Sequence, residues 1–132
     1  MKPPSLSILL DQRLLLFSGL IAAALINLCI FGFPHTRSWG DAEEYNAYAV
    51  NLVTGHGYSM DGSTFSIQRE PGYPAFLALL YEFFSIQSFT AVSFVQAILV
   101  GVLGYMVFVF FDWLRRPKCG VAAGVAIALF PY

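Results

Sequence analysis

The sequence predicts an all-α membrane protein, built as a bundle of transmembrane helices with amphipathic helices at the membrane interface in its first external loop. Two observations lead to this fold class. Hydrophobic residues make up 58% of the 132-residue chain and charged residues only 11%, whereas a typical soluble domain has roughly 25% charged residues. In addition, two apolar runs without any charge each reach the roughly 20 residues that a helix needs to cross about 30 Å of hydrocarbon.

The two uncharged runs, 14–33 and 89–111, are predicted to be complete transmembrane spans. A third apolar run, 119–132, is shorter, and we expect it to be an incomplete third span. Within it, Gly120 and Gly124 have the spacing of a surface that packs closely against a neighbouring helix. On this interpretation residues 1–132 are the N-terminal portion of a larger polytopic domain. The alternative is a complete small protein with a short interfacial tail.

Lysine and arginine residues flank the two spans on one side of the membrane. Two precede the first span and three closely follow the second: Lys2, Arg13, Arg115, Arg116 and Lys118. Because such flanks stay in the cytoplasm, we expect a cytoplasmic N-terminus and an extracytoplasmic loop over 34–88. The expected location is a bacterial inner membrane, with this loop in the periplasm or exterior, although in a eukaryote the loop would face the lumen of a compartment.

Several classes of function find no support in the composition. The formal net charge of −1 offers no basic surface for a nucleic acid. Cys29 and Cys119 are expected to lie roughly a membrane thickness apart, as unpaired cysteines buried in helix packing. No group of residues has metal-site spacing, and we assign neither a metal nor a cofactor. The spans lack the charges of a transport pathway, and Asn27 and Gln96 are expected to bond between helices.

The segment 34–74 holds most of the carboxylates: Asp41, Glu43, Glu44, Asp61 and Glu70. Within it, apolar spacing predicts an amphipathic helix over 41–54. Its apolar side would carry Ala42, Tyr45, Ala49, Leu52 and Val53, and its polar side Asp41, Glu44, Tyr48 and Asn51. Asp41 at or near the N-cap can accept backbone N–H bonds, and acids in the first turn suit the positive end of the helix dipole. Capping alone could therefore explain these acids.

Glycine and proline divide the rest of the loop. Gly55 and Gly57, on either side of His56, are predicted to end the first helix. Residues 58–68 are predicted to form a short hairpin or an extended loop around Asp61-Gly62. After a rigid turn over 70–74, Pro74 is well placed to begin a helix that continues over 75–84. Because this helix is almost wholly apolar but too short to span, we expect it in the interface or against the bundle.

Several short motifs follow the first span in a characteristic order. They are Asp41, Tyr45, Ala49, Asn51-Leu52, Gly55-His56-Gly57-Tyr58 and Pro71-Gly72-Tyr73-Pro74-Ala75-Phe76-Leu77-Ala78. This order resembles the first external loop of the polytopic C-type glycosyltransferases, specifically the glycosyltransferase family 39-like group of dolichyl-phosphate-mannose protein mannosyltransferases and related bacterial enzymes. The resemblance covers about residues 14–132, whereas family members are much longer and have many more helices.

The resemblance implies transfer of a sugar from a polyprenyl-phosphate carrier to an acceptor hydroxyl on the outer face of the membrane. It places the first-loop aspartate, here Asp41, at the active site. The mannosyltransferase branch often has a second acidic residue directly after that aspartate. Ala42 stands at this position, and Glu44 on the same helical face is the carboxylate that would substitute for it.

The residue types in the loop suit this chemistry. Phosphate is already a good leaving group, so one positioned base and one stabilising cation can suffice. Asp41 is the candidate base, and Arg69 the candidate phosphate ligand because a guanidinium forms paired bonds to phosphate. The other candidate substrate-binding residues are Glu44, Tyr45, Glu70 and Tyr73. Arg69 could instead pair with Glu70 or with lipid headgroups, and His56 could be a proton carrier or a plain turn residue.

The sequence therefore favours a membrane glycosyltransferase that uses a lipid-phosphate-linked sugar, present as a portion that we expect to be inactive alone. The expected partners are a polyprenyl-phosphate sugar donor, the lipid bilayer and an acceptor whose class the sequence leaves open. The alternative function is that of a small non-catalytic membrane protein that scaffolds or regulates a partner.

Overall fold

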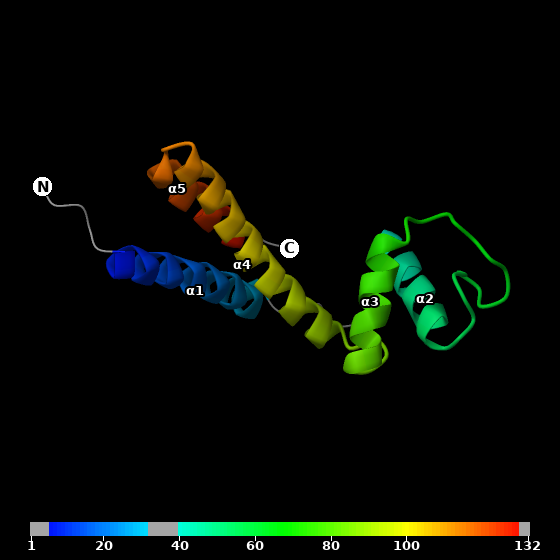
Figure 1. The fold of residues 1–132 in the computed structure, drawn as a ribbon. Coiled ribbons are helices and arrows are strands. Elements are labelled where there is room, and N and C mark those ends of the chain that lie inside the picture. The colour runs from blue at the N-terminus through cyan, green and yellow to red at the C-terminus, as the bar shows by residue number, and fades with distance from the viewer. Residues whose placement is uncertain (1–5, 32–39, 130–132) are drawn as a thin grey trace, which may run out of the picture. The chain divides into compact units, whose positions relative to one another are not determined.

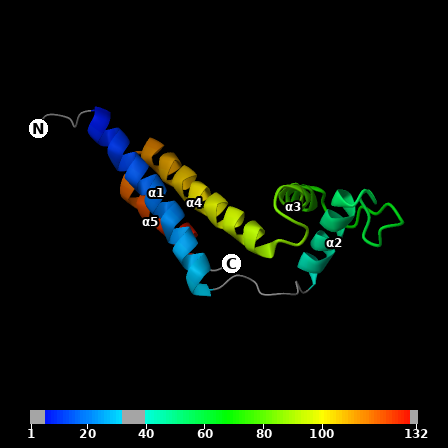
Figure 2. The ribbon, with the colours of Figure 1, turned by 90° about the horizontal axis from the view of Figure 1, so that it is seen from below.

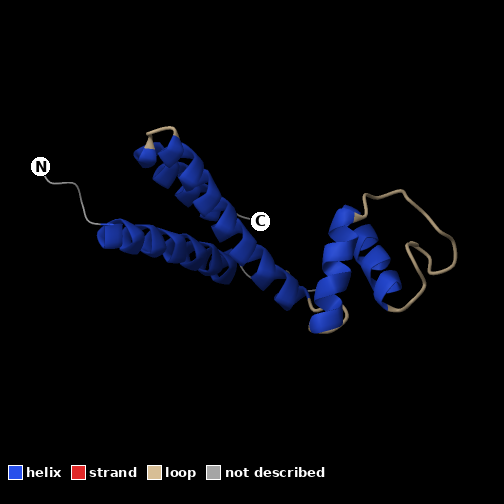
Figure 3. Ribbon diagram, viewed as in Figure 1, coloured by secondary structure: helices blue, strands red, loops and turns tan. Residues whose placement is uncertain are grey.

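The computed structural model describes residues 6–31 and 40–129, and every regular element in these residues is a helix (Figures 1 and 3). The five helices are α1 (Leu6–Phe31), α2 (Asp41–Val53), α3 (Gly72–Phe83), α4 (Phe89–Trp113) and α5 (Pro117–Ala128). They divide into two compact units. One contains α1, α5 and most of α4, and we call it the spanning unit because two of its helices are long enough to cross a membrane. The other, the loop unit, contains α2 and α3. The predicted all-α class is therefore confirmed for the described residues.

Two helices of the spanning unit are long and apolar enough to cross a membrane, namely α1 over Asp11–Ile30 and α4 over Phe89–Trp113. Only 22% of each apolar window is buried by the chain itself, whereas the core helix of a soluble protein is mostly covered. These helices agree with the predicted runs 14–33 and 89–111, although residues 32 and 33 lie outside the described residues. The third run forms the shorter helix α5, which begins at Pro117, two residues before the predicted start.

Glycines bring the helices of the spanning unit into close contact. A Cβ atom added to Gly104 of α4 would lie 2.9 Å from the backbone oxygen of Gly124 in α5, and one added to Gly120 would lie 2.9 Å from Cβ of Phe111. A Cβ atom on Gly101 would meet the Cα of Ile21 in α1 at 2.7 Å. Gly120 and Gly124 therefore form the close packing surface that their spacing predicts. Figure 1 shows α5 folded back alongside α4, and in Figure 2 α1 passes in front of α5.

Polar side chains join the helices of the spanning unit at both ends. Arg13 and Asp112 form an ion pair with 2.6 Å between Nη2 and Oδ2. Buried Asn27 donates from Nδ2 to the backbone oxygen of Ala128 at 3.4 Å, which is the expected bond between helices. Cys29 and Cys119 are both unpaired, as predicted, but both are exposed. The prediction that they are packing residues was wrong because each lies on a helix surface that no other described helix covers.

In the loop unit α2 packs against α3, and their contact buries Ala49 on α2 with Leu77, Leu80 and Tyr81 on α3. The Tyr81 hydroxyl donates to Oδ1 of Asn46 at 2.8 Å. Helix α2 has almost the predicted bounds, but α3 begins at Gly72 and not at Pro74. The reason is that Pro71 already has helical dihedral angles and its carbonyl accepts the N–H of Ala75 at 3.0 Å. Pro74 still lies in the first turn, where its missing N–H costs nothing.

The segment between α2 and α3 turns back over the face of α2 that the sequence predicts to be polar. Gly55 and Gly57, with φ of 81° and 74°, make the left-handed stop expected after the helix. Ser59 and Phe65 then form an isolated antiparallel bridge, the only strand-like pairing in the described residues, so the segment is mainly an extended loop. Asp61 stabilises its tip by accepting the N–H groups of Ser63 and Thr64 at 2.9 and 2.8 Å.

This loop overturns the predicted polarity of one helix face. Tyr48, assigned to the polar side of α2, is fully buried because the ring of Tyr58 stacks on it with 4.5 Å between centroids. Its hydroxyl donates to Oγ of Ser66 at 2.9 Å. Asn51 donates from Nδ2 to the backbone oxygens of Ser59 and Met60. The polar side of α2 is thus mainly an attachment surface for the loop.

Candidate functional site

Five of the six residues that the sequence singles out come together at the N-terminal end of α2. We call them the Arg69 cluster: Asp41, Glu44, Tyr45, Arg69 and Tyr73. Arg69 donates from Nη2 to Oδ1 of Asp41 at 2.5 Å and from Nε to Oε2 of Glu44 at 2.6 Å. One cation therefore bridges two carboxylates that stand about one helical turn apart on the same face of α2.

Aromatic rings complete the cluster. The Arg69 guanidinium carbon lies 5.6 Å from the centroid of the Tyr45 ring, within the range of a cation–π contact. The ring of Tyr73, from the start of α3, meets that of Tyr45 edge to face at 5.4 Å. Tyr73 also stacks on Phe76. The rings thus link α2 to α3 beside the charged groups.

Asp41 does not have the capping role that its position suggests. The N-cap of α2 is Gly40, whose φ of 64° suits a glycine, and no side chain caps the helix. Asp41 is the first helical residue, and its carboxylate makes no capping hydrogen bond but pairs with Arg69. Its side chain is 71% exposed, which leaves it accessible to a hydroxyl from outside.

Arg69 pairs with the two carboxylates of α2. It does not pair with the neighbouring Glu70, which the sequence offered as an alternative partner. The hydrogen bond to Glu44 and the charges of both carboxylates raise the pKa of the guanidinium above its usual value, so Arg69 stays charged. The two bonds use two of the five N–H donors of the guanidinium. The three charged side chains together carry a formal charge of −1.

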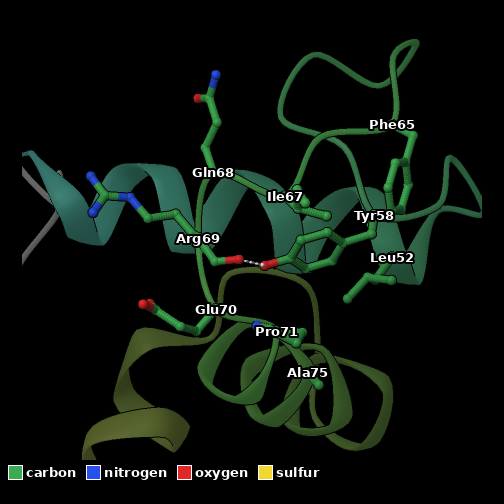
Figure 4. A pocket seen from close by; sticks show the side chains of 9 residues that line it. All are labelled: Leu52, Tyr58, Phe65, Ile67, Gln68, Arg69, Glu70, Pro71 and Ala75. Atoms are coloured by element: carbon green, nitrogen blue, oxygen red, sulfur yellow. Dashed lines mark hydrogen bonds between the residues drawn. The ribbon is translucent and has the colours of Figure 1, made fainter.

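The position of Arg69 depends on residues that the sequence did not identify. The hydroxyl of Tyr58 donates to the backbone oxygen of Arg69 at 2.7 Å (Figure 4). Burial raises the pKa of that hydroxyl, and nearby Tyr48 and Glu70 add to the increase. The available signal in the sequence was the aromatic residue directly after Gly55-His56-Gly57, but nothing local to it indicates a partner eleven residues along the chain.

A surface hollow of about 600 Å³ lies beside the backbone of Arg69. Its lining is mainly apolar and is formed by Leu52, Tyr58, Phe65, Ile67, Gln68, Arg69, Glu70, Pro71 and Ala75. In Figure 4 the side chains of Arg69 and Glu70 extend to one side while the apolar side chains gather on the other. Glu70, the sixth predicted site residue, thus borders the hollow and is not part of the bridged pair.

His56 is occupied by a local contact. Its Nδ1 lies 2.8 Å from Oγ1 of Thr54, at the end of α2, which fits the turn role that the sequence allows. Among the described residues no group of three or more histidine, cysteine, aspartate or glutamate side chains is arranged to hold a metal ion.

Comparisons with protein-family models, with curated proteins and with solved structures find no match to this chain. The geometry of the Arg69 cluster and the residue pattern around it therefore carry the functional argument.

Proposed function

We propose that the protein is a membrane glycosyltransferase that moves a sugar from a polyprenyl-phosphate carrier to an acceptor hydroxyl, with Asp41 as the base. The observation that carries the proposal is that Arg69 meets Asp41 and Glu44 at one accessible point, although it lies 28 and 25 residues from them in sequence. A base and a phosphate-binding cation are the two groups that displacement of a phosphate requires.

In the proposed reaction Asp41 takes the proton of the acceptor hydroxyl. The freed oxygen forms a bond to the anomeric carbon of the sugar, while the bond from that carbon to the carrier phosphate breaks and its electron pair leaves with the phosphate. Arg69 stabilises the departing phosphate by charge-assisted hydrogen bonds. The exposed side chain of Asp41 allows an acceptor to approach.

The ion pairs suggest how a donor would be recognised. A phosphate must compete with two carboxylates for Arg69, because the three side chains already carry a formal charge of −1. When phosphate oxygens replace Oδ1 of Asp41 on the guanidinium, that carboxylate is released to act as the base. Donor binding would therefore precede removal of the acceptor's proton.

We further propose that α1 and α4 cross a membrane with the N-terminus in the cytoplasm, so that the loop 34–88 faces the outside of a bacterial inner membrane. The basic residues at the two ends support this orientation: Lys2 and Arg13 before the first apolar run, and Arg115, Arg116 and Lys118 after α4. The exposed apolar residues Phe83 and Phe84 lie at the end of α3, a few residues before α4, and they support a position of this end in the membrane interface. The Arg69 cluster would then lie on the outer side of the membrane, the side on which a lipid-linked sugar is presented.

Asp41→Asn tests the proposal, with Glu43→Gln as the matched control. Both changes remove one negative charge from the first turn of α2, but only Asp41 pairs with Arg69. In membranes containing the full-length protein and a labelled polyprenyl-phosphate sugar, Asp41→Asn should lower the transfer rate by about 10²-fold or more, in the range of general base catalysis. Glu43→Gln should leave the rate within about twofold of the unsubstituted protein.

Retained transfer in Asp41→Asn would remove Asp41 from the mechanism. If the unsubstituted protein itself transfers no sugar, the Arg69 cluster is a structural device, and the scaffold or regulatory alternative takes precedence.

A further inference from the structure

Tyr58 lies in the segment between α2 and α3 and contacts both α2 and Arg69. Its ring stacks on the buried ring of Tyr48, and its hydroxyl donates to the backbone oxygen of Arg69. Tyr48 belongs to α2, the same helix that carries Asp41 and Glu44. The contacts therefore form a ring. Tyr58 packs on α2 and bonds to Arg69, and Arg69 in turn pairs with the carboxylates of α2.

We propose that Tyr58 is a positioning residue that sets the backbone of Arg69 at the distance from α2 at which the guanidinium bridges Asp41 and Glu44. This inference rests on the proposed function for its catalytic consequence, but the geometry it describes exists whatever the protein does.

The need for such a device follows from the length of the arginine side chain. Arginine loses rotamer entropy when it is held in one conformation, so a fixed backbone helps to direct its guanidinium to one place. The bond at 2.7 Å holds the main chain of Arg69 itself, and the Tyr48 ring under Tyr58 is fully buried and so fixes the other end.

Several groups around Tyr58 bear on the state of its hydroxyl. Burial raises its pKa, and electrostatic interactions with Tyr48, Glu70 and Tyr45 act in the same direction. The hydroxyl therefore keeps its proton under ordinary conditions and remains a donor to Arg69.

Tyr48 provides a matched control. Each tyrosine of the stack donates one hydroxyl bond, but Tyr48 donates to Oγ of Ser66 and Tyr58 to the backbone of Arg69. Tyr58→Phe and Tyr48→Phe keep both rings and remove one hydroxyl each. Only the first removes a direct contact to Arg69.

The first measurement is the nuclear magnetic resonance signal of the Arg69 Nε–H group, which donates to Glu44. This signal can be assigned by its loss in Arg69→Lys. Tyr58→Phe should shift or broaden it, whereas Tyr48→Phe should leave it in place. An unchanged signal in Tyr58→Phe would overturn the positioning role, with or without catalysis.

The second measurement is a double-mutant cycle on the transfer rate. Tyr58→Phe should lower kcat/KM by about tenfold, since a misplaced group costs up to about 10² in rate, and should cause no further loss in an Arg69→Gln background. An equal loss in both backgrounds would show that Tyr58 does not act through Arg69. Absence of transfer in the unsubstituted protein would refute the proposed function, while the resonance of Arg69 would still decide the positioning role.

Discussion

Replacing Gly104 with alanine tests the closest helix contact in the spanning unit. The added methyl carbon would lie 2.9 Å from the backbone oxygen of Gly124, and in the reverse direction a Cβ on Gly124 would lie 2.8 Å from the oxygen of Gly104. Contacts below 3.0 Å are essentially never made by real Cβ atoms. Because a backbone oxygen cannot rotate away as a side chain can, α4 and α5 must move apart.

The size of the effect can be worked out from a control glycine. Gly19 lies in α1 and has nothing within 4 Å of an added Cβ. Alanine is favoured over glycine in a helix by about 1 kcal/mol, and both Gly19→Ala and Gly104→Ala gain this amount. Overpacking costs about 1–3 kcal/mol, and only Gly104→Ala incurs it. We therefore expect Gly104→Ala to be less stable than Gly19→Ala by about 1–3 kcal/mol.

The assay is the free energy of unfolding of the two variants in mild detergent, measured by denaturant titration with pulse proteolysis as the readout. The comparison removes the contribution of helix propensity and leaves the clash. If Gly104→Ala is as stable as Gly19→Ala, α4 and α5 do not pack through their glycines and the reasoning fails.

Two further predictions concern pH in the loop unit. Burial, with a smaller contribution from Tyr73, raises the pKa of Tyr81 to about 12, so the stabilisation that it provides is complete below about pH 10 and is lost as the pH rises toward 12. Tyr81→Phe should weaken this alkaline loss in thermal melts, and an unchanged alkaline profile would contradict the burial of its hydroxyl. Hydrogen bonds from Thr64 and Ser63 lower the pKa of Asp61 to about 2, so its contribution is present above about pH 4 and is lost as the pH falls toward 2. Asp61→Ala should therefore speed proteolysis of the loop at neutral pH, and no difference there would show that the turn does not depend on the carboxylate.

Local patterns predicted the helices well because each depends on residues close in sequence. The uncharged runs located α1 and α4, and glycine after the amphipathic run located the end of α2. Gly120 and Gly124 indicated a packing surface before any partner helix was known. The error at α3 was one of boundary, since a proline can stand anywhere in the first helical turn and does not mark one start position.

The errors in the loop unit have one cause, which is a partner far along the chain. Tyr48 was assigned to the polar side of α2, but the ring of Tyr58 covers it. Capping of α2 was one explanation for Asp41, but its carboxylate pairs with Arg69. In the spanning unit the error was the reverse, because Cys29 and Cys119 were predicted to be buried and no described helix covers them. Periodicity reports which face of a helix is apolar, but it cannot report which loop returns to cover the other face.

The sequence by itself determined the helical class, the two apolar helices long enough to cross a membrane and the collection of carboxylates between them. These properties follow from composition and short-range spacing. Only the tertiary structure decided that Arg69 bridges Asp41 and Glu44 and that Tyr58 holds the backbone of Arg69. The physical reason is that these contacts join residues from 11 to 28 positions apart, and their formation depends on how the loop returns to α2.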